Sequence, residues 1–121
     1  MVMALAAVAM MAQQPVITFE KTDHDFGKIN EADGKVTTIF TFKNEGMEPL
    51  VLSNVRASCG CTTPKWTQKP VMPGKTGEIG VRYNTNNVGG FTKTVTITSN
   101  AVNEARVVVK IKGNVVQPDK N

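Results

Sequence analysis

Hydrophobic and polar side chains alternate along most of this chain with a period of two, which is the spacing of a strand rather than a helix. Residues 36–43 are typical, because Val36, Thr38, Phe40 and Phe42 all fall on one face. Similar runs, rich in β-branched residues, cover residues 16–20, 26–29, 49–57, 77–84, 91–98 and 105–116. The pattern predicts about seven β-strands, each with one buried face.

Short turn sequences separate these runs. They are Ala32-Asp33-Gly34, Asn44-Glu45-Gly46, Pro73-Gly74, residues 86–90 and Ser99-Asn100. Pro73-Gly74-Lys75-Thr76 lacks the upstream glycine of a phosphate-binding loop, so we interpret it as a turn that enters the next strand. Within residues 49–57, simple alternation places Leu50 and Leu52 on one face and Val51 and Val55 on the other.

The strand pattern predicts one all-β domain over residues 15–117, an immunoglobulin-like antiparallel β-sandwich. A closed barrel is the main alternative. An antibody-type domain is not indicated, since its cysteines pair across the two sheets at long separation and the cysteines here are Cys59 and Cys61. Trp66 follows them too closely to be the buried tryptophan of that pattern.

An uncharged apolar run, residues 2–12, begins the chain. Its length suits the core of an export signal and is too short for a membrane span. Residues 1–12 are therefore predicted to be a signal peptide, with the mature chain starting between Met10 and Gln13 and residing in the periplasm or outside the cell. Against this, no Lys or Arg precedes Lys21, and an apolar segment that packs on the domain is the alternative. Residues 118–121 read as a polar tail.

The net charge of +4 does not indicate a nucleic-acid-binding protein, because the fourteen basic residues are spread along the chain and mostly alternate with apolar ones. Catalysis is also not indicated. The sequence has one histidine, no nucleophile with an identifiable base and no paired carboxylates. We expect no enzymatic activity and no bound cofactor.

The two cysteines lie in the string Ser58-Cys59-Gly60-Cys61-Thr62. In an extended strand, residues two apart are separated by roughly 6.6 Å, whereas disulfide-bonded Cβ atoms lie about 3.8 Å apart. An extended Cys59-Gly60-Cys61 therefore cannot close on itself. A turn in which Gly60 takes an unusual φ allows a bridge, but the small loop gains little stability from it.

If the thiols are free, the pair can instead bind a soft metal ion such as Cu(I). His24 is the only imidazole available as a further ligand, and Met47 and Met72 are the thioether candidates. A redox role is a third alternative. It has little support in the sequence. Reactive thiols are usually activated by a helix N-terminus or a nearby cation, whereas here no helix is predicted and the nearest cations are Arg56 and Lys65. The Cys-x-x-Cys motif of thioredoxin-like proteins is also not present.

Several strings resemble those of the bacterial domain-of-unknown-function family 1573. They are Asp25-Phe26-Gly27, residues 42–46, Pro49-Leu50, Ser58-Cys59-Gly60-Cys61-Thr62, Trp66, residues 73–77, residues 90–100 and Ile111-Lys112-Gly113. The resemblance covers about residues 16–116. It implies an exported domain with no established activity, similar in fold to the immunoglobulin-like domains of the major sperm protein and Hydin type.

These observations favour a non-enzymatic binding or structural module of the bacterial envelope. Residues 16–20 and 105–116 are the predicted edge strands to which a protein partner could add a strand of its own. The alternative is a copper-binding or redox protein centred on Cys59 and Cys61.

Overall fold

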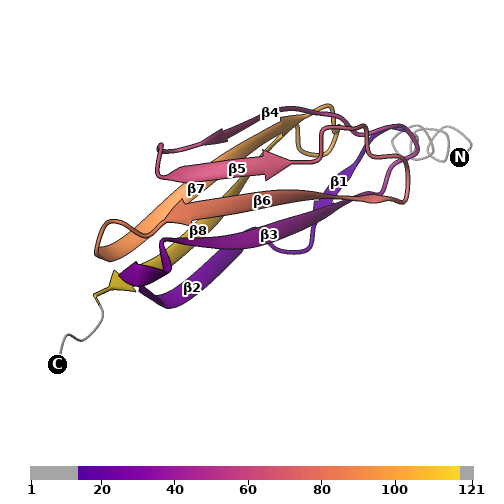
Figure 1. Cartoon of the computed structure of the whole chain (residues 1–121). Helices are drawn as coiled ribbons and strands as arrows, with labels where there is room; N and C mark the ends of the chain where they lie inside the picture. Colours follow the sequence, from indigo (N-terminus) through magenta and orange to yellow (C-terminus); the bar gives the residue numbers. More distant parts are fainter. Residues whose placement is uncertain (1–13, 118–121) are drawn as a thin grey trace, which may run out of the picture.

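The computed structural model describes residues 14–117 and confirms the immunoglobulin-like β-sandwich (Figure 1). The predicted signal peptide and polar tail lie outside the described residues. Eight strands and one short 3-10 helix form the fold: β1 Ile17–Phe19, β2 Asp23–Asn30, η1 Glu31–Asp33, β3 Lys35–Asn44, β4 Leu52–Ala57, β5 Thr62–Trp66, β6 Thr76–Asn84, β7 Gly89–Ser99 and β8 Arg106–Val116.

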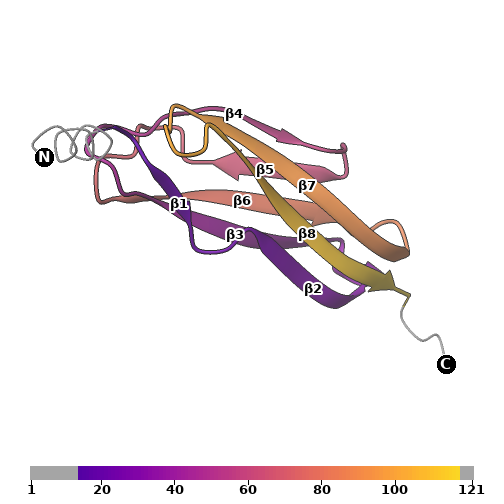
Figure 2. The same cartoon turned by 180° about the vertical axis from the view of Figure 1, so that it is seen from behind.

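The strands form two four-stranded sheets with the orders β1-β3-β6-β5 and β2-β8-β7-β4. All pairs are antiparallel except β2 with β8, which is parallel. Both views show the reason, since the chain leaves β1 and enters β2 in the other sheet without turning back (Figures 1 and 2). The sheet containing β2 is therefore mixed, which the purely antiparallel prediction missed.

The inward faces of both sheets form one core, as the alternation predicted. Of the four residues assigned to one face of the 36–43 run, Thr38, Phe40 and Phe42 are buried and Val36 is half-buried. Phe42 pairs with Gly77 on β6, and a Cβ at Gly77 would overlap its ring. The opposite sheet contributes fully buried residues to the same core: Val95, Ile97, Val109, Ile111 and Val115.

Two strand assignments from the sequence were incomplete. β5 was missed because Pro64 interrupts its pattern; the strand tolerates a proline since it lies at the edge of its sheet. In β4, the register shifts between Leu52 and Asn54, so a β-bulge inserts one extra residue. The prediction that Val55 shares a face with Val51 was therefore wrong: Val55 is buried and Val51 is exposed.

The buried side chain of Asn44 connects three segments at the end of the sandwich where β6 begins. Its Nδ2 donates to the carbonyls of Glu48 (2.7 Å) and Val71 (2.9 Å). Its Oδ1 accepts from the N–H groups of Gly46 (2.9 Å) and Val16 (3.3 Å). The sequence had marked Asn44 only as a turn residue, but the side chain fixes both the turn and the start of β1.

Replacing Phe40 with Ala is expected to lower the free energy of unfolding by about 3–5 kcal/mol, because a fully buried aromatic side chain leaves a cavity. Ile39→Ala is the matched control, since its side chain lies on the outer face of the same strand and is 50% exposed. Chemical denaturation of both variants measures the difference. Equal destabilisation by the two changes would contradict the assignment of Phe40 to the buried face of β3 and of Ile39 to its outer face.

Candidate functional site

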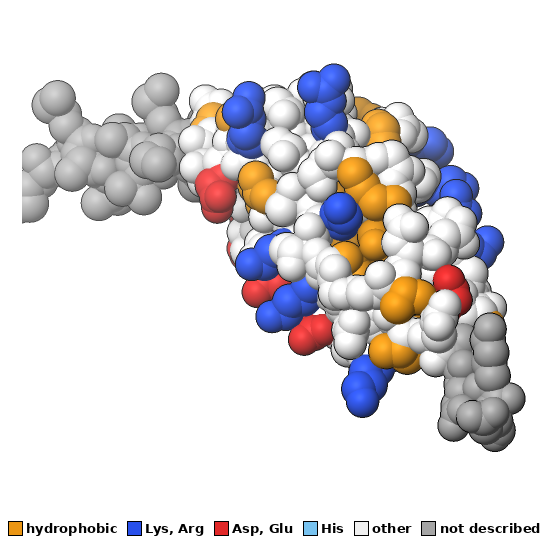
Figure 3. Space-filling model, turned by 90° about the vertical axis from the view of Figure 1, so that its left-hand side faces the viewer, with side chains coloured by type: hydrophobic (Ala, Val, Ile, Leu, Met, Phe, Trp, Pro, Cys, Tyr) orange, Lys and Arg blue, Asp and Glu red, His pale blue; other side chains and the backbone are white. Residues whose placement is uncertain are grey.

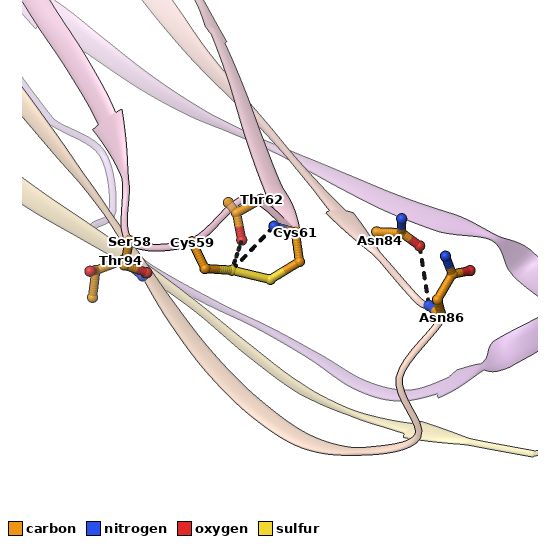
Figure 4. The surroundings of a disulfide bond; sticks show 7 residues. All are labelled: Ser58, Cys59, Cys61, Thr62, Asn84, Asn86 and Thr94. Atoms are coloured by element: carbon orange, nitrogen blue, oxygen red, sulfur yellow. Dashed lines mark hydrogen bonds between the residues drawn. A yellow bond between two sulfur atoms is a disulfide. The ribbon is translucent and has the colours of Figure 1, made fainter.

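The two cysteines are joined by a disulfide in the turn between β4 and β5 (Figure 4). Their Cα atoms lie 5.5 Å apart, and the Thr62 N–H closes the turn by donating to the Cys59 carbonyl over 3.3 Å. The sequence left open whether the cysteines are free, metal-bound or joined in a turn, and in the structure they are joined in a turn. The expected role of Gly60 was wrong, since Gly60 is not among the positive-φ glycines and a Cβ there would meet nothing within 4 Å.

The two sulfur atoms have different surroundings. Cys59 Sγ accepts a hydrogen bond from the Cys61 N–H (3.3 Å) and lies 3.9 Å from Oγ1 of Thr62, a buried side chain (Figure 4). Cys61 instead lines a small surface pocket of about 180 Å³. The other residues of this pocket are Gly34, Lys35, Gly60, Thr63, Arg82 and Asn84. The disulfide is thus hydrogen-bonded at Cys59 Sγ, while Cys61 borders a partly basic pocket and packs against the core.

The structure does not bring His24 to the cysteines. His24 lies on β2 and Cys59 follows β4, and these strands form opposite edges of one sheet with β8 and β7 between them. Lys21 Nζ lies 2.9 Å from His24 Nδ1, and the Phe26 ring packs against the imidazole. Desolvation by burial, followed by the positive charge of Lys21, lowers the pKa of His24.

The two methionine candidates are also remote from the disulfide. The Cys61 carbonyl accepts a hydrogen bond from the N–H of Asn84, the last residue of β6. Met72 precedes the first residue of β6, so the length of this nine-residue strand separates Met72 from the disulfide. Met47 borders a surface hollow together with Pro73 and Gly74, which follow Met72, so both methionines lie at that end of the sandwich. Met47 and Met72 are 64% and 52% exposed. Within residues 14–117, no cluster of three or more His, Cys, Asp or Glu side chains is placed to hold a metal ion.

The sheet edges differ from those predicted for partner binding. Residues 105–116 were expected to form an edge, but β8 lies between β2 and β7. β1 is an edge strand, as expected for residues 16–20, but its free side is already partly occupied. Asn103 hydrogen-bonds to both the N–H and the carbonyl of Ile17 (3.0 and 2.8 Å), and the Val102 N–H donates to the Pro15 carbonyl.

Two more edges are blunted by local features. In β5, Cys61 and Thr67 form hydrogen bonds with β6, so by alternation Pro64 points its backbone nitrogen to the free side, where it has no N–H to offer. The pairing of β2 with β8 is irregular between Asp25 and Lys28, and the Asp25 carboxylate accepts a hydrogen bond from the N–H of Gly27 (2.8 Å). Bulges and prolines of this kind discourage strand addition.

β4 has a bulge of its own between Leu52 and Asn54, but from Asn54 to Ala57 it pairs with β7 in regular register and contains no proline. The Ser58 N–H donates to Thr94 on β7 over 2.9 Å, and Arg56 is opposite Thr96. Because hydrogen-bonding residues alternate, Val55 and Ala57 direct their N–H and carbonyl groups away from β7. No hydrogen bond from elsewhere in residues 14–117 reaches these groups. Sequence reasoning missed this edge, since its register depends on the bulge.

Charge is dispersed on one face of the molecule. On the face shown in Figure 3, Lys and Arg side chains are spaced apart with Asp and Glu side chains among them, and hydrophobic side chains gather near the middle. This face has no continuous basic stripe. No helix within the described part of the chain is long and apolar enough to cross a membrane.

Comparison with known proteins identifies the family. A family model described as "Protein of unknown function (DUF1573)" matches residues 17–115. The chain belongs to the DUF1573 family. This confirms the resemblance inferred from the sequence. No curated protein matches significantly.

Solved structures share the fold at low sequence identity. A protein of unknown function from Porphyromonas gingivalis W83 superposes with a TM-score of 0.74 at 19% identity over 86% of this chain, which spans only 48% of that protein. The PapD-like domain 7 of human CEP192 gives 0.71 at 5% identity, covering 90% of this chain and 89% of the domain. The C. elegans protein WR4, of the major sperm protein family, gives 0.53 at 8%, covering 84% and 98%. The similarity establishes an immunoglobulin-like fold.

Replacing both cysteines with Ser is expected to preserve cooperative unfolding and to cost less than about 2 kcal/mol, because the disulfide closes a loop of only a few residues. Chemical denaturation of this variant and of reduced wild-type chain checks the value. Loss of the cooperative transition would show that the disulfide is a main support of the fold.

Proposed function

We propose that this DUF1573 chain is an exported, non-enzymatic β-sandwich module of the bacterial envelope that binds a protein partner along β4. The open edge of β4 is the observation that carries the proposal. Val55 and Ala57 each direct one N–H and one carbonyl to the free side of the sheet. A partner strand that pairs there extends the β2-β8-β7-β4 sheet by β-augmentation.

Partly exposed hydrophobic side chains beside this edge indicate the chemistry of the partner. Leu52 and Ala57 on β4 and Trp66 on β5 pack against the core but remain partly exposed. β5 runs next to β4 on the same side of the sandwich (Figures 1 and 2). An added strand would place alternate side chains over these residues, so we expect an extended segment with apolar residues at every second position.

The disulfide and the apolar N-terminal run support the export part of the proposal. Disulfides persist in the periplasm or outside the cell and are rare in the cytosol. Residues 2–12 have the length and composition of a signal-peptide core. Both features fit a chain that folds after export.

A photo-reactive amino acid at position 56 is expected to cross-link a partner in bacteria that naturally export the chain, because Arg56 is exposed on the outer face of β4. Position 108 is the matched control, since Val108 is 51% exposed on β8, in the interior of the same sheet. Cross-linked products are compared on denaturing gels and identified by mass spectrometry. Equal cross-linking from the two positions, or none from position 56, would contradict the proposed edge.

The variant Ala57→Pro refines this test. It removes an N–H that points away from β7 and leaves the ladder to β7 intact, so the cross-link from position 56 should disappear while the fold persists. Circular dichroism verifies the fold. Cross-linking that continues in the folded variant would mean that backbone pairing at β4 is not the mode of binding.

Export is tested by fractionating cells and sequencing the N-terminus of the chain recovered outside the cytoplasm. We expect a mature chain that starts between Met10 and Gln13. A chain found only in the cytoplasm with residues 1–12 intact would overturn the export proposal. The proposal that a partner binds along β4 would then still be tested by the cross-linking experiment.

A further inference from the structure

The Cys59–Cys61 disulfide contributes little as a structural staple. It joins residues only two apart in the sequence, and closing so small a loop removes little entropy from the unfolded chain. The turn also has its own hydrogen bond from Thr62 N–H to the Cys59 carbonyl. Stability therefore does not account for the disulfide, and its chemical environment becomes the more informative feature.

The environment of Cys59 suits a leaving thiolate. The Cys61 N–H already donates to Cys59 Sγ over 3.3 Å, and the hydroxyl of Thr62 lies 3.9 Å from the same sulfur. A thiolate accepts stronger hydrogen bonds than a disulfide sulfur does, because it carries a full negative charge. Both donors are held in place by the turn, so the charge would be stabilised as soon as it develops.

Cys61 borders the 180 Å³ surface pocket, and Cys59 does not. Both cysteines are half-buried, and Cys61 also packs against the core, so the pocket is the side from which a thiolate would reach Cys61. Lys35 and Arg82 line the same pocket and supply positive charge where an incoming thiolate would approach. The pocket and the hydrogen bonds thus assign opposite roles to the two cysteines.

We propose that the Cys59–Cys61 disulfide is a thiol–disulfide exchange site that oxidises a dithiol of another protein. A thiolate of that dithiol attacks Cys61 Sγ, the Cys59–Cys61 bond breaks, and its electron pair leaves on Cys59, which then takes up a proton. The second thiolate of the partner then attacks the partner's first sulfur in the mixed disulfide. The bond to Cys61 breaks, and its electron pair leaves on Cys61 Sγ, which takes up the second proton. Two electrons pass from the dithiol to the cysteine pair, and the partner leaves with a disulfide.

This chemistry is additional to strand binding at β4 and does not depend on it. The experiments for the two proposals are also separable, since exchange can be followed with small thiols that cannot pair with a sheet edge. The full mature chain is used in each measurement.

Oxidised chain is mixed with excess glutathione, quenched in acid within seconds, and the glutathione adduct is located by tandem mass spectrometry. We expect the adduct on Cys61 to exceed that on Cys59 by at least about tenfold. A reduced two-cysteine peptide should then be converted to its disulfide while the chain becomes a dithiol. A predominant adduct on Cys59, or a disulfide that does not react with either thiol, would overturn the proposal.

The role of the hydrogen bonds is tested by the rate at which glutathione reduces the chain. Thr62→Val keeps the buried shape but removes the hydroxyl near Cys59 Sγ, so the rate should fall about fivefold. Thr38→Val is the matched control, because Thr38 is also buried but lies on β3 and should leave the rate unchanged. Comparing the rates of the two variants tests whether Cys59 is the leaving sulfur, even if the glutathione adduct breaks down too quickly to be trapped. Equal rates for wild type and Thr62→Val would contradict it.

Discussion

The constraint on which the structure depends is that each open β-sheet has two edges whose backbone N–H and carbonyl groups need partners or protection. This sandwich has four such edges, and it treats them differently. The side chain of Asn103 pairs with the N–H and carbonyl of Ile17 on β1. Asp25 and a bulge disrupt β2, and Pro64 removes a donor from β5. β4 also contains a bulge, but beyond it the stretch from Asn54 to Ala57 is regular and contains no proline. Among the described edges, this stretch is therefore the one that best suits pairing with a partner strand.

The turn between β4 and β5 connects this edge to the chemistry of the cysteines. It carries the chain from one sheet to the other, and Cys61 is anchored to the end of β6 by the Asn84 N–H. A segment that pairs with β4 would run beside the disulfide, because Cys59 follows Ala57 by two residues. Partner binding and thiol exchange would then occur on one side of the molecule, while Asn44 fixes the opposite end.

Local alternation was sufficient to predict the core and insufficient to predict the edges. Phe40 and Phe42 could be assigned because their burial follows from the period of a single strand. β8 was mistaken for an edge, since its position between β2 and β7 depends on a sheet switch at residues 20–22 that no local pattern encodes. The prediction of the face on which Val55 lies was wrong for a similar reason, because one inserted residue moves every side chain beyond the bulge to the opposite face.

The candidate site was predicted only in part. The cysteine pair was evident from its spacing, but whether it bridges depends on a turn that forms through the Thr62 N–H and not through an unusual φ at Gly60. His24 seemed available as a ligand because sequence separation says little about sheet order. The structural role of Asn103 was also invisible, since its partner Ile17 lies 86 residues away in the sequence.

Amide hydrogen exchange along β4 tests the central claim most directly. If the free side of β4 is open, the amides of Val55 and Ala57 should exchange much faster than those of Arg56 and Ser58, which face β7. The amides of β8 provide the reference for a strand that is paired on both sides. Alternating protection in β4 would support the account. Equal protection of these four amides in the isolated chain would contradict it.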